Sequence, residues 1–273
     1  MEPTEEEFVT QVMKHLFRSR GIDLSGYSQS FVLRCIKRRV SRSHSGDHAG
    51  YLKVLTHSDD ETNELLNTLS INVTEFFRDR AAWEGFVKSI LKPMLKYKME
   101  AGGLLRMWSA GCASGQETYT MAMCVAEVLE EIDPAEQPMV SVLGTDISQR
   151  ALTKAKAGIY TKEDVRSLPE RMAAKYFVQK GDSFEISDAV AKRVRFVREN
   201  LLDKPSLKYF DVVVCRNVMI YFSRKMHETV ARNLYEALRQ GGYLMLGRTE
   251  TLLGAPRDGF NVIDLENRIL QKK

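Results

Sequence analysis

The sequence predicts an α/β protein with a doubly wound parallel sheet and a separate helical domain at its N-terminus. From about residue 101 onward, strand-like and helix-like segments alternate, whereas residues 1–70 show helical patterns alone. Several predicted strands, among them residues 210–215, are near-continuous apolar runs, which is typical of parallel strands buried on both faces. With 273 residues, the chain is long enough for one large domain or two smaller ones.

The helical domain is expected to cover residues 1–70. Thr4 and Glu7 have the spacing of a capping box, and apolar residues follow them at helical intervals. Three acidic residues from Asp59 onward favour the N-terminus of a later helix. Further helices are expected over about residues 28–41 and 48–55 and from residue 59, followed by a linker and a helix over residues 71–100.

The doubly wound domain is expected to cover residues 101–273. Long helices are expected after the first strand and over about residues 225–239, and Gly241-Gly242 is expected to turn the chain into the last strand. Residues 176–199 do not fit the alternation, because short β-like segments there are joined at Gly181-Asp182, which predicts a small β insertion closed by a hairpin. The predicted strands of the main sheet cover residues 104–108, 140–145, 193–199, 210–215 and 243–246.

The composition excludes several classes of function. Lys and Arg number 40 and Asp and Glu 36, and a formal charge of +4 is too balanced for a protein that binds nucleic acid over a broad surface. No apolar run approaches the roughly 20 residues of a membrane-spanning helix, and the acidic N-terminus differs from a signal peptide. The four cysteines form no C-x-x-C pair, and no metal-ligand cluster is present. We expect a cytoplasmic monomer that binds neither nucleic acid nor a metal and does not insert into a membrane.

A glycine-containing turn marks a candidate cofactor site. The segment 109–117 joins the first strand to the next helix, and Gly111 and Gly115 let a ligand approach the backbone near free helix N–H groups. Asp146 ends the second strand, where a carboxylate can accept hydrogen bonds from both hydroxyls of a ribose; it could instead cap the following helix. The turn lacks the G-x-G-x-x-G pattern of dinucleotide enzymes, which favours S-adenosylmethionine over a nicotinamide dinucleotide.

Polar residues also follow the fourth strand. Arg216 and Asn217 come directly after Cys215, and polar groups at the carboxyl end of a central strand face the crevice where α/β proteins bind ligands. Arg216 could equally be an ordinary surface charge. Its position after a central strand favours a site residue.

Four motifs together resemble a known family. They are Asn72-Val73-Thr74-Glu75-Phe76-Phe77-Arg78-Asp79, the segment from Ser109 to Glu117, Gly144-Thr145-Asp146-Ile147, and the segment from Cys215 to Phe222. In this order, and over nearly the whole chain, the sequence resembles the chemotaxis receptor methyltransferases of the CheR type. The resemblance implies an S-adenosylmethionine-dependent methyltransferase domain with an N-terminal helical domain and a small β insertion. It implies methyl transfer to glutamate carboxylates of chemoreceptor cytoplasmic domains, giving glutamate methyl esters and S-adenosylhomocysteine.

The resemblance also implies which residues contact the cofactor. Arg78 would lie beside cofactor and substrate and would orient the reacting carboxylate. The sequence departs from the family at Gln116-Glu117, where two acids are common, and at Arg248-Thr249, where His-Ser is common; we assign no role to the latter turn. The implied cofactor contacts are Asn72, Thr74, Arg78, Glu117, Asp146, Asn200, Leu201, Arg216 and Asn217.

Two features suggest how a receptor is recognised. Arg34, Arg38 and Arg42 recur every four residues and line one helical face. A solvated stripe would explain them, but the resemblance implies acidic receptor helices as substrate, so we expect this face to dock the receptor. Some family members bind a peptide at the receptor's C-terminus through a longer loop in the β insertion. The compact segment 179–183 predicts methylation that does not need this peptide.

The sequence patterns are also compatible with three other functions. One is an S-adenosylmethionine-dependent methyltransferase of another substrate, such as RNA or a small molecule. A second is a nicotinamide-dependent oxidoreductase, and a third is a non-catalytic receptor-binding scaffold of the same fold.

Glutamate methylation needs neither a general base nor a metal, because an exposed glutamate, with a pKa of about 4.3, is already an ionised nucleophile at neutral pH.

Overall fold

The chain divides into two compact units. The computed structural model describes residues 4–20, 24–43, 45–69 and 74–273, apart from the side chain of Asn67. The first unit comprises Met1–Ile71 and Tyr221–His227, and the second comprises Asn72–Ile220 and Glu228–Lys273. Within the described residues, no helix is both long and apolar enough to cross a membrane.

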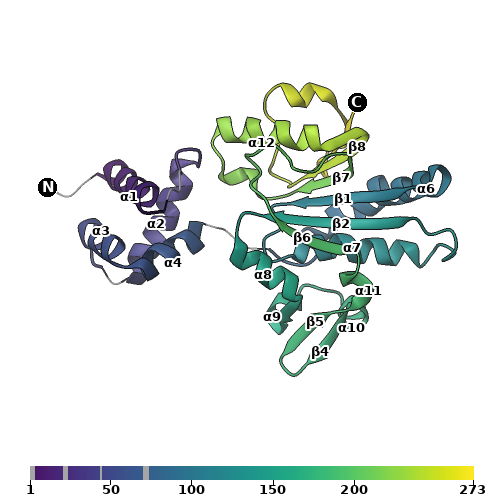
Figure 1. The fold of residues 1–273 in the computed structure, drawn as a ribbon, viewed down its shortest axis with the longest axis horizontal. Helices are drawn as coiled ribbons and strands as arrows, with labels where there is room; N and C mark the ends of the chain where they lie inside the picture. The colour runs from purple at the N-terminus through teal and green to yellow at the C-terminus, as the bar shows by residue number, and fades with distance from the viewer. Residues whose placement is uncertain (1–3, 21–23, 44, 70–73) are drawn as a thin grey trace. The chain divides into compact units, whose positions relative to one another are not determined.

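The first unit is a group of helices around a small core (Figure 1). The predicted capping box at its start forms, because Thr4 N donates to Glu7 Oε2 at 2.9 Å and Glu7 N donates to Thr4 Oγ1 at 3.3 Å. Phe8, Phe31 and Leu65 come from three different helices and are almost fully buried in one apolar cluster. The helices are α1 (Glu5–Arg20), α2 (Gln29–Ser43), α3 (His48–His57) and α4 (Asp59–Leu69).

The second unit is built on a seven-stranded sheet with the strand order β6-β2-β1-β7-β8-β10-β9 (Figure 1). The first five strands of this order pair in parallel, whereas β10 is antiparallel to both β8 and β9. The predicted parallel sheet is therefore confirmed. The strands are β1 (Leu104–Ala110), β2 (Met139–Asp146), β6 (Val194–Arg198), β7 (Phe210–Cys215), β8 (Leu238–Leu246), β9 (Phe260–Asp264) and β10 (Ile269–Lys272).

Strand β7 illustrates why the strand patterns are continuous rather than alternating. Val212 and Val214 belong to the core that also contains residues of α5 and α7, while Val213 and Cys215 point to the opposite face, and all four are fully buried. The sheet is therefore covered on both faces, as a doubly wound fold requires. The helices of this unit include α5 (Arg80–Phe86), a π-helical turn (Val87–Leu91), α6 (Lys92–Ala101), α7 (Gln116–Leu129), α8 (Gln149–Ala157) and the part of α12 (Arg224–Ala237) from Glu228 onward.

The small β insertion differs from its predicted extent. Its sheet has the order β3-β5-β4 and consists of β3 (Ile159–Thr161), β4 (Phe177–Lys180) and β5 (Ser183–Ile186), with α9 (Lys162–Val165) and α10 (Glu170–Tyr176) between β3 and β4. The predicted insertion range 176–199 wrongly includes β6, whereas the strand expected over residues 193–199 of the main sheet is confirmed, because β6 pairs in parallel with β2. Val194 and Phe196 of β6 pack against the main core, and this burial favours the main sheet.

The region around β8 contains a second correction. Helix α12 ends at Ala237, and the predicted turn at Gly241-Gly242 lies inside β8 as a bulge, since Phe210 pairs with Leu238 but Val212 pairs with Tyr243. The sequence patterns do not predict β9 or β10. In the edge strand β9, adjacent Val262 and Ile263 are both exposed, so the alternation that marks a half-buried strand is absent.

Candidate functional site

The candidate site lies where three strands of the main sheet end side by side. Strands β2, β1 and β7 are parallel neighbours, so their carboxyl ends meet at one edge of the sheet. Numbered by their appearance in this sheet, the strands run 3-2-1-4-5-7-6, and the order reverses between β1 and β7. Ligands of open α/β sheets bind at such a reversal. Asp146 is the last residue of β2, Glu117 lies at the start of the helix after β1, and Arg216 directly follows β7, so the structure brings them to the same edge.

The glycine turn after β1 ties these strand ends together. Gly111 N and Cys112 N donate to Thr145 O at the end of β2, at 2.8 and 2.9 Å. Gly111 has a φ of 81°, and a Cβ built there would lie 2.6 Å from Val218 Cγ2 in the turn after β7. A side chain at this position would therefore both strain the backbone and separate the turns.

Asp146 is held by backbone donors on both sides. Its Oδ2 accepts from Ala113 N at 2.9 Å and its Oδ1 from Ser148 N at 2.8 Å. Ser148, not Asp146, caps α8, because its side chain accepts from Ala151 N. Burial raises the pKa of Asp146, although the backbone donors oppose the rise. A carboxylate has about four acceptor positions, so Asp146 retains capacity for ligand hydroxyls.

Glu117 lies in the first turn of α7 and accepts a hydrogen bond from Ser109 Oγ at 2.8 Å. Burial raises the pKa of the Glu117 carboxyl to about 7, and the negative charge of Glu250 adds to the rise. The positive charges of Arg216 and Arg78 and the Ser109 hydrogen bond oppose it. Glu117 is thus electrostatically coupled to both predicted arginines of the site.

Arg216 joins the end of β7 to the loop that carries Arg78. Its Nη1 donates to Arg78 O at 2.9 Å, and its Nη2 donates to Asp79 Oδ2 at 2.7 Å. The guanidinium also lies 5.4 Å from the centroid of the Trp83 ring, and only 2% of the Arg216 side chain is exposed. Two non-glycine residues of this loop, Phe77 and Asp79, have φ values of 52° and 58°. Such strain is typical of functional loops that their surroundings hold in place.

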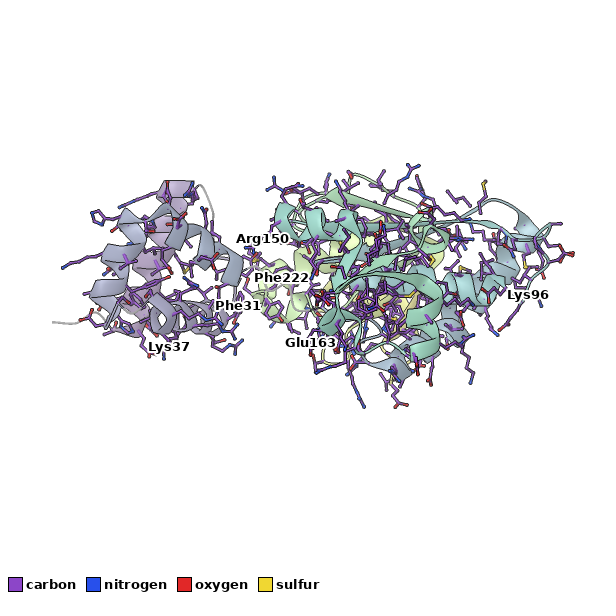
Figure 2. All side chains as sticks on the ribbon, turned by 90° about the horizontal axis from the view of Figure 1, so that it is seen from below. Phe31, Lys37, Lys96, Arg150, Glu163 and Phe222 are labelled. Atoms are coloured by element: carbon purple, nitrogen blue, oxygen red, sulfur yellow. The ribbon has the colours of Figure 1, made fainter. Side chains whose placement is uncertain are left out.

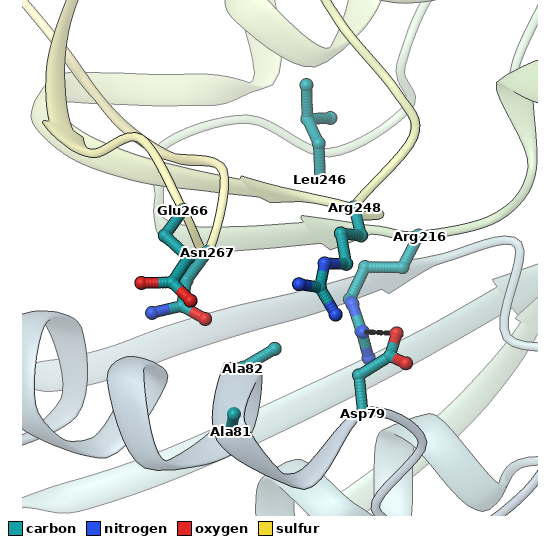
Figure 3. Close-up of a pocket in the computed structure, with 8 residues that line it drawn as sticks. All are labelled: Asp79, Ala81, Ala82, Arg216, Leu246, Arg248, Glu266 and Asn267. Atoms are coloured by element: carbon teal, nitrogen blue, oxygen red, sulfur yellow. Dashed lines mark hydrogen bonds and ion pairs between the residues drawn. The ribbon is translucent and has the colours of Figure 1, made fainter.

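Figure 3 shows a small cavity beside the Arg216–Asp79 pair. The cavity has a volume of about 60 Å³, and the guanidinium of Arg248 points into it toward this pair. Arg248 belongs to the turn for which the sequence suggested no role, and it shares the cavity with a predicted site residue. The lining residues are Asp79, Ala81, Ala82, Arg216, Leu246, Arg248, Glu266 and Asn267.

Asn217 supplies an observation that points to a ligand. Its φ is 60°, and its side-chain Oδ1 is buried with no hydrogen-bond partner among the described residues. A buried acceptor without a donor is costly, so the residue suits a site in which a bound molecule provides the donor. Together with the carboxylates of Glu117 and Asp146, this acceptor fits a molecule rich in hydroxyl and amino groups, such as S-adenosylmethionine.

The structure shows fewer interactions around the remaining predicted cofactor residues. Glu199 N donates to Asp146 O at 3.1 Å, which brings the segment after β6 to the same sheet edge. There, Asn200 Oδ1 accepts from Leu202 N at 3.1 Å, and Leu201 O accepts from Asn233 Nδ2 at 2.9 Å. Thr74 is partly buried at the start of the Arg78 loop, and Asn72 lies outside the described residues.

One buried residue of this region escapes sequence reasoning altogether. Glu250, 2% exposed, follows β8 and accepts backbone hydrogen bonds from the turn after β7. The only sequence signal is an acidic residue shortly after a strand that neighbours β7. That signal is weak, because acidic residues are common in surface turns.

The basic residues of α2 fall into two groups, those paired with an acidic residue of the first unit and those exposed without such a pair. Arg39 makes two hydrogen bonds to Glu61, at 2.9 and 2.6 Å, and Lys37, at the surface of the unit in Figure 2, pairs with Glu5. The three predicted docking residues, Arg34, Arg38 and Arg42, are exposed, and no ion pair of theirs is found within the described part of the chain. These three guanidinium groups are therefore available at the surface.

Comparison with protein families gives two matches that together cover most of the chain. A family model described as "CheR methyltransferase, SAM binding domain" matches residues 72–269. A second, described as "CheR methyltransferase, all-alpha domain", matches residues 9–70. The boundary between the two matches falls at the boundary between the two structural units.

Individual proteins show the same similarity. The chain is 32% identical over 246 residues to a "Chemotaxis protein methyltransferase" of Listeria monocytogenes, covering 90% of this chain and 89% of that protein. It is 32% identical over 253 residues to a protein of the same name from Borreliella burgdorferi, covering 90% and 88%. It is also 31% identical over 271 residues to an "Uncharacterized 104.1 kDa protein in hypE 3'region" of Rhodobacter capsulatus, of which it spans only 28%.

Proposed function

Because this chain belongs to the CheR methyltransferase family, we propose that it transfers methyl groups from S-adenosylmethionine to glutamate side chains of chemoreceptor cytoplasmic domains. The products would be glutamate methyl esters and S-adenosylhomocysteine. The observation that carries the proposal is the convergence of Glu117, Asp146 and Arg216 at the reversal of strand order, in a chain whose matched family binds this cofactor.

We assign distinct tasks to the residues of the cofactor site. Asp146 would accept hydrogen bonds from the ribose hydroxyls with the acceptor positions that Ala113 and Ser148 leave free. Glu117 and Asn217 would accept from amino or hydroxyl groups of the bound molecule. The remaining contacts to the cofactor would come from Asn72, Thr74, Arg78, Asn200, Leu201 and Arg216. S-adenosylmethionine supplies a methyl group on a positively charged sulfur, which needs no metal or acid to activate it.

The remaining tasks are placement and desolvation of the acceptor carboxylate. A receptor glutamate is ionised at neutral pH, so the enzyme needs no general base. The Arg78 guanidinium would orient this carboxylate, and Arg216 would hold Arg78 in place through its carbonyl. A strong two-pronged grip on both attacking oxygens would make them poorer nucleophiles, so we assign Arg78 an orienting role. Exclusion of water would remove the solvation that blocks attack.

Receptor docking is assigned to the exposed face of α2. Arg34, Arg38 and Arg42 would attract acidic receptor helices, and their lack of ion pairs within the described residues leaves their charges available. We further propose that the protein acts as a monomer in the cytoplasm, where the receptor domains that it modifies are located.

Transfer of labelled methyl groups to purified receptor signalling domains tests this function. We expect the full chain to label the receptor, and mild base to release the label, because carboxyl methyl esters are base-labile. A receptor domain with its acceptor glutamates changed to alanine serves as the control. Label that resists base, or that enters RNA or a small molecule instead, would assign the protein to another methyltransferase class. Failure to bind S-adenosylmethionine would favour a scaffold.

A further inference from the structure

We propose that Glu250 is a positioning residue, which fixes the turn carrying Arg216 and Asn217 so that both side chains meet cofactor and substrate in their reactive arrangement. This inference rests on the proposed function. Neither the family matches nor the sequence motifs assign a role to this residue.

The geometry around Glu250 is that of a clamp between two turns. Its Oε1 accepts from Val218 N and Met219 N, at 2.9 and 2.8 Å, in the turn after β7. Its Oε2 accepts from Asn217 N at 2.7 Å and from Gly247 N, after β8, at 2.8 Å. Four backbone donors thus converge on one carboxylate, and strands β7 and β8 are parallel neighbours. The carboxylate therefore locks the ends of both strands together.

Gly247 is part of the same arrangement. A Cβ built on Gly247 would lie 2.5 Å from Glu250 Oε2 and 2.9 Å from Asn217 N. Any side chain at this position would force the carboxylate and the turn apart. The close approach of Glu250 to the turn therefore depends on glycine at position 247.

The clamp acts on residues that matter for the reaction. Asn217 has a φ of 60°, a conformation that non-glycine residues seldom adopt without support, and its backbone N–H is one of the four donors. Arg216 directly precedes it and holds Arg78 O and Asp79. Glu250 is therefore connected to Arg78 in three steps. Its carboxylate accepts from Asn217 N, the turn carries Asn217 and Arg216, and the Arg216 side chain donates to Arg78 O.

Asp211 offers a comparison, because it is a buried carboxylate at the other end of β7, the strand whose carboxyl end Glu250 holds. It is the second residue of β7, is 1% exposed and accepts from Arg106 N at 2.8 Å, so like Glu250 it is a buried carboxylate that binds a backbone donor. Unlike Glu250, it also forms ion pairs with Lys98 at 3.0 Å and with Arg239 at 2.5 Å. Asp211 lies at the amino end of the strand, away from the strand ends that form the site. Loss of Asp211 should weaken the fold without altering the site.

The test compares Glu250→Gln, Glu250→Asp, Gly247→Ala and Asp211→Asn in the full chain. Glu250→Gln replaces an acceptor oxygen with an NH₂ group and removes about half of the clamp. We expect its dissociation constant for S-adenosylmethionine to rise about tenfold and its kcat on receptor to fall, with little change in KM for receptor. Glu250→Asp keeps both oxygens and should recover part of each loss. Gly247→Ala should reproduce the Gln defect with Glu250 present.

Calorimetric titration and initial rates, scaled to the folded fraction, separate the outcomes. Asp211→Asn should lower Tm while its folded molecules bind cofactor like wild type. If Glu250→Gln binds and methylates within twofold of wild type, or if Asp211→Asn loses as much affinity, the positioning role is wrong. If Glu250→Gln does not fold, Gly247→Ala decides by the same twofold criterion. Failure of the wild-type protein to bind S-adenosylmethionine contradicts the proposed function instead.

Discussion

Arg216 donates a hydrogen bond to the backbone oxygen of Arg78 at 2.9 Å, across a sequence separation of 138 residues. The two predicted site arginines are thus mechanically linked: one side chain holds the backbone of the other. A second bond from the same guanidinium reaches Asp79, which adopts a φ of 58°. The loop that carries Arg78 is therefore held in its strained form by a residue at the carboxyl end of the central strand β7.

Arg216→Lys should reduce catalysis more than stability. A lysine ammonium cannot reproduce the planar two-bond contact with Arg78 and Asp79, so the loop loses at least one charge-assisted hydrogen bond. Such a bond contributes about 1.5–3 kcal/mol, which corresponds to roughly tenfold or more in kcat. Initial rates on receptor fragments measure the effect. Arg106→Lys, which changes an arginine bonded to Lys208 O at 2.7 Å, is the control and should retain its rate.

Asp146→Ala should weaken binding of S-adenosylmethionine by roughly ten- to a hundredfold, because the acceptors for the ribose hydroxyls are lost. The variant should also be less stable, since Ala113 N and Ser148 N lose their acceptor. Calorimetric titration and thermal unfolding measure the two effects separately. Asp133→Ala, in an exposed turn where Asp133 Oδ1 accepts from Ala135 N, should leave the affinity unchanged. Unaltered affinity in folded Asp146→Ala would remove this residue from the site.

Stability should depend on Glu117 in a defined pH window. Burial raises the folded-state pKa to about 7 from 4.5, so the folded state binds the proton more tightly than the unfolded state. The stabilising effect of this proton is fully present below about pH 4.5 and is lost as pH rises through about 7. We therefore expect the Tm of Glu117→Gln, relative to wild type, to increase between about pH 4.5 and 7 and then level off.

Glu127, near the other end of α7, should affect stability with the opposite dependence on pH, because its pKa is lowered and not raised. Its hydrogen bonds to Lys175 and Tyr176 hold its pKa below 4.5 despite partial burial, so its stabilising effect is present above that pH and is lost as pH falls further. Glu127→Gln should differ from wild type above about pH 4.5 and approach it in acid. Parallel curves of Tm against pH for the two variants would contradict both assignments.

The same titration of Glu117 should affect binding. Wild-type affinity for the cationic cofactor should rise with pH toward about 7, and Glu117→Gln should show no such rise.

Reversal of charge at Arg38 and Arg42 should slow receptor methylation. The double variant to Glu places negative charges where an acidic receptor helix is expected to dock, so association slows and its dependence on salt flattens. Affinity for S-adenosylmethionine should not change. Reversal of Lys14 and Lys53, exposed residues on α1 and α3, gives the same change in net charge and should have little effect. Wild-type rates at low salt for the Arg variant would contradict docking on this face.

Methylation should proceed without the last few residues of the receptor. Strands β4 and β5 are joined by Gly181 and Asp182 alone, so the hairpin has no extended loop to form one wall of a peptide pocket. Rates on receptor fragments with and without their C-terminal residues should agree within about twofold, and the free peptide should not bind. Micromolar binding of that peptide, or a large loss of rate on truncation, would contradict this expectation.

Several features of the site could be predicted because they are local in the chain. The glycine turn at Gly111, Asp146 at a strand end and Arg216 after an apolar strand follow from short patterns of sequence, and the parallel order of the sheet brings them to one edge. The structure corrected what depends on pairing. The sequence patterns place residues 193–199 both in the main sheet and in the insertion, and the pairing of β6 with β2 decides for the main sheet. The expected turn at Gly241-Gly242 is a bulge within β8.

The sequence by itself determined the fold class, the helical first unit and the positions of the motifs at the candidate site, because periodicity and turn chemistry act over a few residues. Only the tertiary structure decided which side chains work together. Arg39 and Arg38 are adjacent on α2, yet Arg39 is tied to Glu61 and Arg38 is exposed. Glu250 accepts a hydrogen bond from Asn217 N, which lies 33 residues earlier in the chain. Such contacts arise from the packing of distant segments, where burial and the need to satisfy every backbone donor select partners that no local pattern specifies.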